Sequence, residues 1–153
     1  MILLIYLRKA FDSVSFSFLE LILEMFGFGP NYREGISILL KGFSACTVVN
    51  GKISERFAIK RGCRQGDPIS GYLFILCIKI LVLALQNSKA KPYQTRKNTF
   101  HLQEQYADDL TIFPEYVRDD NCKNAYIVRH IIKVLDKFYV LSGIGVRKSN
   151  MQL

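Results

Sequence analysis

The chain lacks the cysteine and histidine spacings that build a zinc site. Its four cysteines include no C-x-x-C pair, and His101 and His130 are too scattered to complete a ligand pattern. A secretory signal is also missing, because Arg8 and Lys9 interrupt the apolar start too early for one. We therefore expect reduced and mostly buried thiols and an intracellular location, in the nucleus or the cytoplasm.

Long hydrophobic runs are scarce as well. The most apolar run, residues 72–85, contains Lys79 and is too short to span a bilayer, which favours a buried core helix and no membrane role. Half of the 153 residues are nevertheless hydrophobic, with eleven Phe and eight Tyr, and such a chain buries a core instead of staying disordered. We expect a single domain, residues 1–153.

Acidic residues are few. The chain has 13 Asp and Glu against 21 Lys and Arg, which gives a formal net charge of +8. This balance favours phosphate-rich partners such as nucleic acid. A basic surface that serves only solubility explains the same numbers, so charge alone leaves both interpretations open.

Hydrophobic periodicity predicts an α+β fold. The continuous apolar run 2–7 is typical of a strand buried on both faces. Asn50-Gly51 is the strongest local signal for a type I′ turn, because both positions must accept a positive φ. The other expected elements are helices over 17–26 (with a Ser17–Glu20 capping box), 31–40, 68–85 and 121–141, a loop over 87–98, a hairpin of 99–106 with 110–113, and a strand over 144–146. This order predicts helices packed on an antiparallel sheet.

Two adjacent carboxylates stand at the tip of the predicted hairpin, in Tyr106-Ala107-Asp108-Asp109. Neighbouring side chains of an extended strand point to opposite faces, so the turn is what exposes both carboxylates together. Such oxygen atoms are suitable ligands for a divalent cation such as Mg²⁺. For an isolated pair, a solvated Asp-Asp turn is the alternative.

A second block upstream is Arg61-Gly62-Cys63-Arg64-Gln65-Gly66-Asp67-Pro68-Ile69-Ser70, and the further blocks are Lys9–Val14, Phe28–Pro30, Tyr72–Cys77 and Ser142-Gly143. In this order they resemble the palm domain of the reverse transcriptases of non-LTR (LINE-type) retrotransposons, whose YADD and RQGxPxS boxes they match. The resemblance covers nearly the whole chain. It implies a polymerase palm, an antiparallel sheet packed by helices on one face, with fingers and thumb largely absent.

The resemblance also implies RNA-directed DNA polymerase activity by two-metal nucleotidyl transfer, with Mg²⁺ or Mn²⁺ as cofactor. Asp108 and Asp109 then match two of the three catalytic, metal-binding aspartates of the family. The third position, in the pattern D-x-x-K-A-F-D, is Tyr6 here. A neutral and bulkier phenol replaces a metal ligand at this position, so we predict weak or absent polymerase activity. Asp12 is expected to cap the following helix, with a substitute metal ligand as the lesser alternative.

Four positions match the nucleotide-binding residues of the family: Phe11, Arg64, Gln65 and Gly66. Phe11 matches the aromatic residue under the incoming sugar, although an ordinary core phenylalanine is equally consistent with the sequence. Gly66 allows close backbone approach, and the Gln65 amide can bond a sugar or base edge. Arg64, like Arg61, is expected to face phosphates, with a solvated loop charge as the alternative.

Two further positions depart from the family pattern. Asn150 replaces a lysine that lies near the departing pyrophosphate, with Lys148 close by. Lys79 falls inside the predicted buried helix, where a lysine is costly unless it is paired or reaches solvent.

The expected partners are an RNA template, a DNA primer and deoxynucleoside triphosphates, together with other retrotransposon protein segments. Two alternatives stay open. One is a non-catalytic basic module that binds nucleic acid, and the other is metal-dependent phosphodiester cleavage by Asp108 and Asp109 alone.

Overall fold

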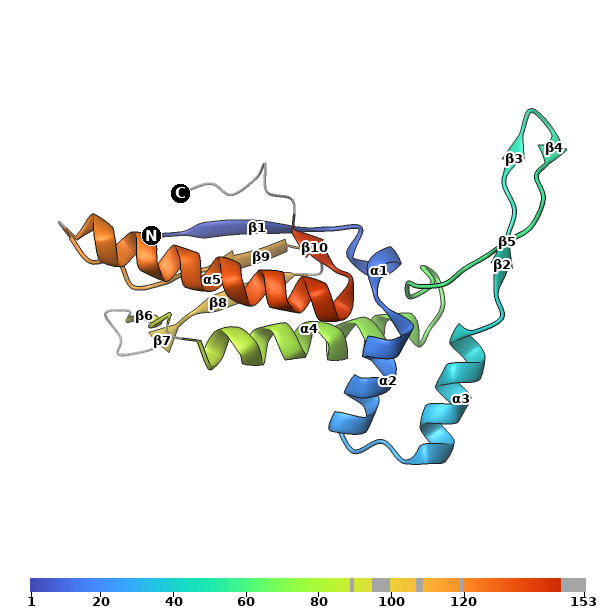
Figure 1. The fold of residues 1–153 in the computed structure, drawn as a ribbon, viewed down its shortest axis with the longest axis horizontal. Coiled ribbons are helices and arrows are strands. Elements are labelled where there is room, and N and C mark those ends of the chain that lie inside the picture. Colours follow the sequence, from blue (N-terminus) through green and yellow to red (C-terminus); the bar gives the residue numbers. More distant parts are fainter. Residues whose placement is uncertain (89, 95–99, 107–108, 119, 147–153) are drawn as a thin grey trace.

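A four-stranded antiparallel sheet forms the centre of the computed structural model, which describes all residues except 89, 95–99, 107–108, 119 and 147–153. Its strand order is β10-β1-β9-β8. The strands are β1 (Leu3–Arg8), β8 (Gln103–Tyr106), β9 (Asp109–Ile112) and β10 (Gly145–Val146). The long helices α4 (Ser70–Gln86) and α5 (Asn121–Ser142) run along the sheet (Figure 1). The predicted mixture of helices and antiparallel sheet is confirmed.

The opening strand is buried on one face only. Leu3, Ile5 and Leu7 are at most 3% exposed, whereas Tyr6 and Arg8 between and after them are exposed. Strand residues alternate between faces, so the apolar set packs into the core and the other set lines an open face. The predicted strand buried on both faces is therefore wrong, because helices cover one side alone.

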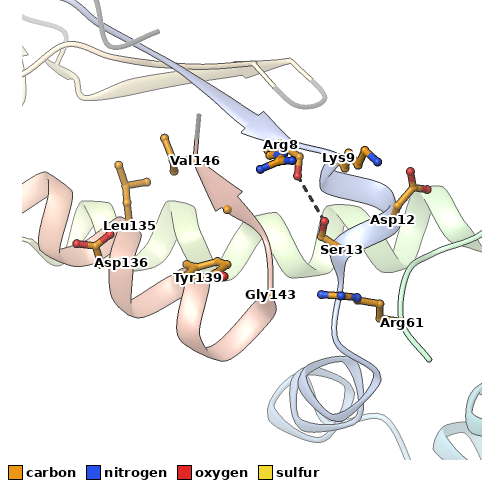
Figure 2. A pocket seen from close by; sticks show the side chains of 11 residues that line it. Arg8, Lys9, Asp12, Ser13, Arg61, Leu135, Asp136, Tyr139, Gly143 and Val146 are labelled. Atoms are coloured by element: carbon orange, nitrogen blue, oxygen red, sulfur yellow. Dashed lines mark hydrogen bonds between the residues drawn. The ribbon is translucent and has the colours of Figure 1, made fainter. Parts of the chain in front are cut away.

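A sharp turn leads from β1 into the short helix α1 (Ala10–Ser13). Lys9 adopts a left-handed conformation with φ 46°, and the Ser13 hydroxyl donates a 3.4 Å hydrogen bond to the Arg8 carbonyl (Figure 2). Asp12 lies inside α1 and is exposed, and the next helix is preceded by Ser15. The prediction that Asp12 caps that helix is wrong.

Two helices, α2 (Phe16–Met25) and α3 (Pro30–Leu40), follow as an antiparallel pair. The predicted Ser17–Glu20 capping box does not form. The Glu20 carboxylate instead accepts hydrogen bonds from Ser37 and Lys41 on the α3 side, and Lys41 holds the pKa of Glu20 below its ordinary value. A long-range ion pair between Glu20 and Lys41 thus takes the place of the predicted local capping hydrogen bonds.

Beyond α3 the chain forms a narrow ribbon that projects away from the sheet and the long helices (Figure 1). Its strands are β2 (Ser44–Ala45), β3 (Val48–Val49), β4 (Lys52–Ile53) and β5 (Phe57–Ala58). Asn50 and Gly51 have φ values of 50° and 77°, which confirms the predicted turn. A further small pair joins β6 (Tyr93–Gln94), which lies in the segment that was expected to be loop, with β7 (Phe100–His101), which lies in the predicted hairpin strand 99–106.

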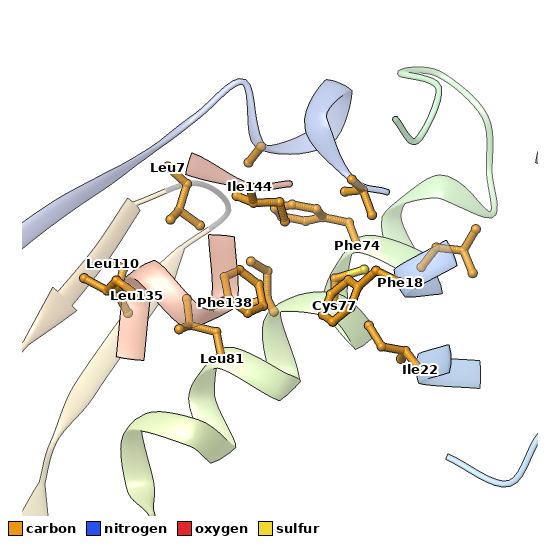
Figure 3. Packing of buried hydrophobic residues seen from close by; sticks show 14 of the residues in the cluster. Leu7, Phe18, Ile22, Phe74, Cys77, Leu81, Leu110, Leu135, Phe138 and Ile144 are labelled. Atoms are coloured by element: carbon orange, nitrogen blue, oxygen red, sulfur yellow. The ribbon is translucent and has the colours of Figure 1, made fainter. Parts of the chain in front are cut away.

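The core lies between the sheet and the helices (Figure 3). Phe138 of α5 meets Phe18 of α2 edge-on at 5.7 Å between ring centroids. Lys79 lies on the exposed side of α4, so the expected cost of burying it does not arise. Among the described residues, no helix has both the length and the apolar character to cross a membrane.

The end of α5 docks against the junction of α1 and α2. The Ser15 amide donates a 2.7 Å hydrogen bond to the Ser142 carbonyl. Gly143 ends the helix with φ 79°, and a Cβ atom built on it would lie 2.5 Å from the Ser13 carbonyl oxygen. Only a glycine permits this approach. This contact between the end of α5 and the α1–α2 junction fixes α1 against the rest of the domain.

Candidate active site

Tyr6 and Asp109 are direct partners across the central pair of strands. The register of β1 with β9 places Tyr6 opposite Asp109, and Ile5 opposite Leu110. Both polar side chains lie on the open face of the sheet, since Ile5 and Leu110 are buried and Asp109 and Tyr6 are exposed. Asp108 lies outside the described residues. The structure therefore brings one of the two predicted catalytic carboxylates to the residue that replaces the third.

The described residues do not by themselves complete a site for divalent cations. Within that part of the chain, no group of three or more His, Cys, Asp or Glu side chains lies close enough to hold a metal ion. Asp109 has a phenol as its cross-strand neighbour, and two closely spaced cations need several carboxylates. At position 6 the predicted donor set has a phenol in place of a carboxylate.

The block that contains Phe11 and the block that begins at Arg61 are joined by main-chain hydrogen bonds. The Cys63 amide donates to the Phe11 carbonyl at 2.7 Å, and the Gly62 amide donates to the Val14 carbonyl at 2.8 Å. Gly62 has φ 98°, and a Cβ atom there would lie 2.9 Å from the Asp12 carbonyl oxygen. Gly62 is thus the residue that lets the second block approach α1.

The Phe11 ring is half-buried and stacks on Phe74 of α4, with centroids 4.1 Å apart and planes at 21°. The ring therefore has a packing partner in the folded chain. Its inner side packs against the core, and part of the side chain remains accessible to solvent.

Arg64 is held within its own loop. Its guanidinium donates to the Asp67 carboxylate at 2.8 Å and lies 3.7 Å from the centroid of the Phe43 ring. The other oxygen of Asp67 accepts from the Ile69 amide and so fixes the start of α4. Gln65 and Gly66 form an exposed turn at the same place, with Gly66 at φ 88°.

Cysteine chemistry is not available in this loop. Cys63 is 1% exposed, and burial together with the charge of Asp67 raises the pKa of its thiol to about 11. Burial raises the pKa of Cys77 further still. The reactive form of cysteine is the thiolate, so both side chains are inert at neutral pH. The prediction of mostly buried thiols is wrong, because only these two are buried, whereas Cys46 and Cys122 are exposed.

A cavity of about 670 Å³ opens where β1 ends, between α1, β10 and α5 (Figure 2). Its polar lining consists of Arg8, Lys9, Asp12, Ser13, Arg61, Asp136 and Tyr139. The sequence does not predict this cavity as one site, because its polar residues come from three separate segments, 8–13, 61 and 136–139. Only Arg61, expected to face phosphates, and Asp12, the alternative metal ligand, have a predicted role there.

These features are those of a polymerase-like domain, and comparison with known proteins identifies the class. Residues 1–151 match the family "Reverse transcriptase (RNA-dependent DNA polymerase)", and the chain belongs to this family. Its relatives are proteins of non-LTR retrotransposons, which confirms the resemblance inferred from the sequence.

Three relatives illustrate the similarity. The chain is 25% identical over 123 residues to an uncharacterized 149 kDa protein of transposon TX1 from Xenopus laevis, covering 78% of this chain and 9% of the relative. It is 32% identical over 108 residues to a Pol polyprotein of a type-2 retrotransposable element from Drosophila melanogaster, covering 70% and 10%. It is 30% identical over 83 residues to a Pol polyprotein of a type-1 element from Popillia japonica, covering 54% and 14%. The chain thus spans 9 to 14% of the length of these three relatives.

Proposed function

We propose that this chain is the palm of an RNA-directed DNA polymerase whose nucleotidyl transfer is impaired by Tyr6. The observation that carries the proposal is the cross-strand pairing of Tyr6 with Asp109 on the open face of the sheet. A carboxylate at position 6 would stand directly opposite Asp109, one member of the proposed catalytic pair. A phenol there supplies no charge to hold a divalent cation.

The energetic argument follows from charge. Mg²⁺ or Mn²⁺, when bound, supplies the charge that activates the primer hydroxyl and stabilises the triphosphate. Asp108 and Asp109 are the residues that would hold it, and their donor set is incomplete without a third carboxylate. Losing one electrostatic stabiliser of a transition state costs roughly 10²–10³ in rate, and a lost metal ligand costs at least as much.

Substrate binding is proposed for the segment that joins α1 to α4. The main-chain hydrogen bond between Cys63 and Phe11 supports this, because it holds Phe11 close in the fold to the loop that carries the exposed turn of Gln65 and Gly66. Gln65 would bond the sugar or base, and Phe11 would pack under the sugar. Arg64 would reach a phosphate only by exchanging its ion pair with Asp67, which makes it a switchable contact. The template, the primer and deoxynucleoside triphosphates are the proposed partners, together with further segments of a retrotransposon protein.

Primer extension tests the proposal. A chimera in which residues 1–153 replace the matching segment of a relative's polyprotein is compared with the same chimera carrying Tyr6→Asp, in Mg²⁺ and in Mn²⁺. We expect extension to rise by about 10² or more in Tyr6→Asp. Tyr6→Asn is the matched control that removes the phenol without adding charge, and it should stay inactive. Equal activity of the unsubstituted chimera and Tyr6→Asp would overturn the proposed impairment.

A second candidate function is non-catalytic binding of nucleic acid. The projecting ribbon favours it, since Lys52, Arg56 and Lys60 are all exposed there and the chain carries a net charge of +8. Affinity for an RNA–DNA hybrid should then fall steeply with salt, because bound phosphates release counterions. Replacing the three ribbon cations with alanine should flatten that salt dependence. Hybrid binding without extension by Tyr6→Asp would favour this second function over the first.

A further inference from the structure

A second cavity, of about 600 Å³, lies at the end of β1 that is remote from α1. Figure 1 shows the N-terminus beside the first half of α5, far along the sheet from α1 and β10. We call this space the Met1 cavity. Its lining consists of Met1, Tyr116, Asn121, Asn124, Ala125, Val128 and Arg129. None of these residues belongs to the candidate active site.

The lining of the Met1 cavity is mainly apolar. Met1, Ala125 and Val128 contribute aliphatic side chains, and the half-exposed Tyr116 contributes its ring. Asn124 contributes little polarity, because its amide groups already have partners in the main chain. Its side-chain oxygen accepts from the Val117 amide at 3.1 Å, and its side-chain nitrogen donates to the Val117 carbonyl at 2.9 Å. A concave apolar space with few polar groups is typical of a small-molecule site.

The walls of the cavity are held in place. The two hydrogen bonds between Asn124 and Val117 fix the segment that carries Tyr116 against α5. The first turn of α5 is capped by Asp120, whose carboxylate accepts from the Lys123 amide at 2.9 Å and pairs with the Lys123 ammonium at 3.0 Å. A cavity that exists before binding costs the ligand complex less conformational entropy, which favours affinity.

Arg129 supplies the charge of the lining. It is exposed and lies one helical turn after Ala125 on α5. In the part of the chain that the structure describes, the four ion pairs all involve other residues, and no carboxylate lines the cavity. The N-terminus of α5 offers no second place for an anion, because Asp120 already occupies it. An anionic group in this cavity would therefore bind at Arg129.

The size of the cavity decides between a protein partner and a small molecule. A stable protein interface takes about 20–30 residues from each side, far more than the seven that line this space. Small ligands occupy cavities of about 300–1,000 Å³, a range that includes this one.

We infer that the Met1 cavity binds a linear aliphatic carboxylate, of the fatty-acid class. The hydrocarbon chain covers Met1, Ala125 and Val128 and lies against the Tyr116 ring. The carboxylate accepts hydrogen bonds from the Arg129 guanidinium, whose planar fork matches two carboxylate oxygens. This site goes beyond the proposed polymerase function and is independent of it, because it shares no residue with the candidate active site.

Isothermal titration of the 153-residue chain tests the inference, with every probe kept below its micelle concentration. Hexanoate, octanoate and decanoate form the length series. Each methylene that enters the cavity should tighten binding about three- to fourfold. Octanol and octylammonium test the charge, and both should bind more weakly than octanoate. Equal affinity for octanoate and octylammonium overturns the inference, and so does an affinity that does not change with chain length.

Variants of α5 locate the site. Arg129→Met should weaken octanoate binding about three- to tenfold and leave octanol binding unchanged, because it removes an exposed charge-assisted contact. Arg129→Glu should reverse the preference, so that octylammonium binds more tightly than octanoate. Ala125→Phe fills the cavity and should abolish binding of all probes. Lys133→Met is the matched control, since Lys133 is an exposed cation one turn beyond Arg129 that does not line the cavity.

Lys133→Met should bind octanoate as the unsubstituted chain does, and circular dichroism verifies that each variant is folded. Equal losses in Lys133→Met and Arg129→Met would overturn the inference, as they indicate unspecific attraction to a basic surface. Unchanged binding in a folded Ala125→Phe would also overturn it, because the probe would then occupy another place. Should Ala125→Phe not fold, the exposed variant Arg129→Glu decides, and an unaltered preference for octanoate in it contradicts the proposed site.

Discussion

Tyr6 and Asp109 face one another across β1 and β9, on the exposed face of the sheet, opposite the buried side chains of Ile5 and Leu110. The register that sets this pair is firmly specified. Leu3, Ile5, Leu110 and Ile112 fill the core from the same two strands, and a slip by one residue would expose all four. The core thus holds position 6 opposite Asp109 whichever side chain occupies it.

Tyr6→Asp should convert this position into part of a cation site. Without metal, a second carboxylate opposite Asp109 repels it, at about 0.2–1 kcal/mol for a cross-strand pair. We expect the melting temperature in EDTA to fall by about 1–3 °C. Mg²⁺ or Mn²⁺ should restore it, because an ion that binds only the folded state stabilises that state.

Scanning calorimetry with and without metal measures this effect in the isolated chain. Tyr6→Asn provides the comparison, as it opens the same space without a charge. If both variants respond equally to Mg²⁺, position 6 is not part of a metal site.

Gly143→Ala should destabilise the domain strongly. The left-handed conformation costs an L-residue about 1–2 kcal/mol, and relieving the 2.5 Å approach to the Ser13 carbonyl adds about 1–3 kcal/mol of strain. Urea unfolding should therefore show a loss of about 2–5 kcal/mol. Gly66 is the matched position, since its φ is 88° but no atom lies within 4 Å of the added Cβ.

Gly66→Ala should accordingly lower the free energy of unfolding only by the cost of the left-handed conformation, about 1–2 kcal/mol. Similar losses at the two glycines would mean that the end of α5 can move away from α1. In that case this contact would not fix α1 against the rest of the domain.

The raised pKa of the buried Cys63 thiol predicts that the domain loses stability at alkaline pH. Its pKa is raised from an ordinary value of 9.0 to about 11 in the folded chain. The stability that the protonated Cys63 thiol contributes to the folded state is therefore fully present below pH 9. It is lost as the pH rises through 11, because the unfolded chain releases this proton first. At pH 10 the loss should be about 1 kcal/mol.

The comparison of unsubstituted chain and Cys63→Ala by urea unfolding at pH 7, 8, 9 and 10 isolates this contribution. Other groups titrate in both proteins and cancel in the difference. A stability difference that stays constant from pH 7 to 10 would show that the thiol ionises as easily in the folded state as in the unfolded state.

Elements with a strong local pattern could be predicted from the sequence. The amphipathic stretch 121–141 is α5, and the Asn50-Gly51 turn has the positive φ values that its residues favour. Features that depend on residues far apart in the sequence could not be predicted in this way. Glu20 leaves its expected capping role because Lys41, brought close by the pairing of α2 with α3, offers a full charge.

The candidate site likewise has a part that the sequence predicted and a part that only the fold determines. Short motifs predicted Asp109 and the loop around Gln65, because each motif lies on consecutive residues. The exposure of Tyr6 depends on which face the helices cover, and a continuous apolar run does not encode that choice. The cavity at the end of β1 joins Arg8, Arg61 and Asp136, which are far apart in the sequence, and only the fold places them around one space.

Lys79→Met should leave the domain stable but make it associate. Lys79 is exposed on α4 beside Tyr72 and Ile75, which are 73% and 64% exposed, and it borders a groove of about 250 Å³ lined mainly by apolar side chains. Because the lysine is not buried, its loss should change the unfolding free energy by no more than about 0.5 kcal/mol. Removing its charge joins the apolar residues into a continuous exposed strip, which promotes self-association.

Sedimentation velocity at rising concentration measures this self-association, with Lys79→Arg as the control that keeps the charge and stays monomeric. A loss of 2 kcal/mol or more in Lys79→Met, as expected from a lysine that is paired or packed, would contradict the exposed position of this side chain.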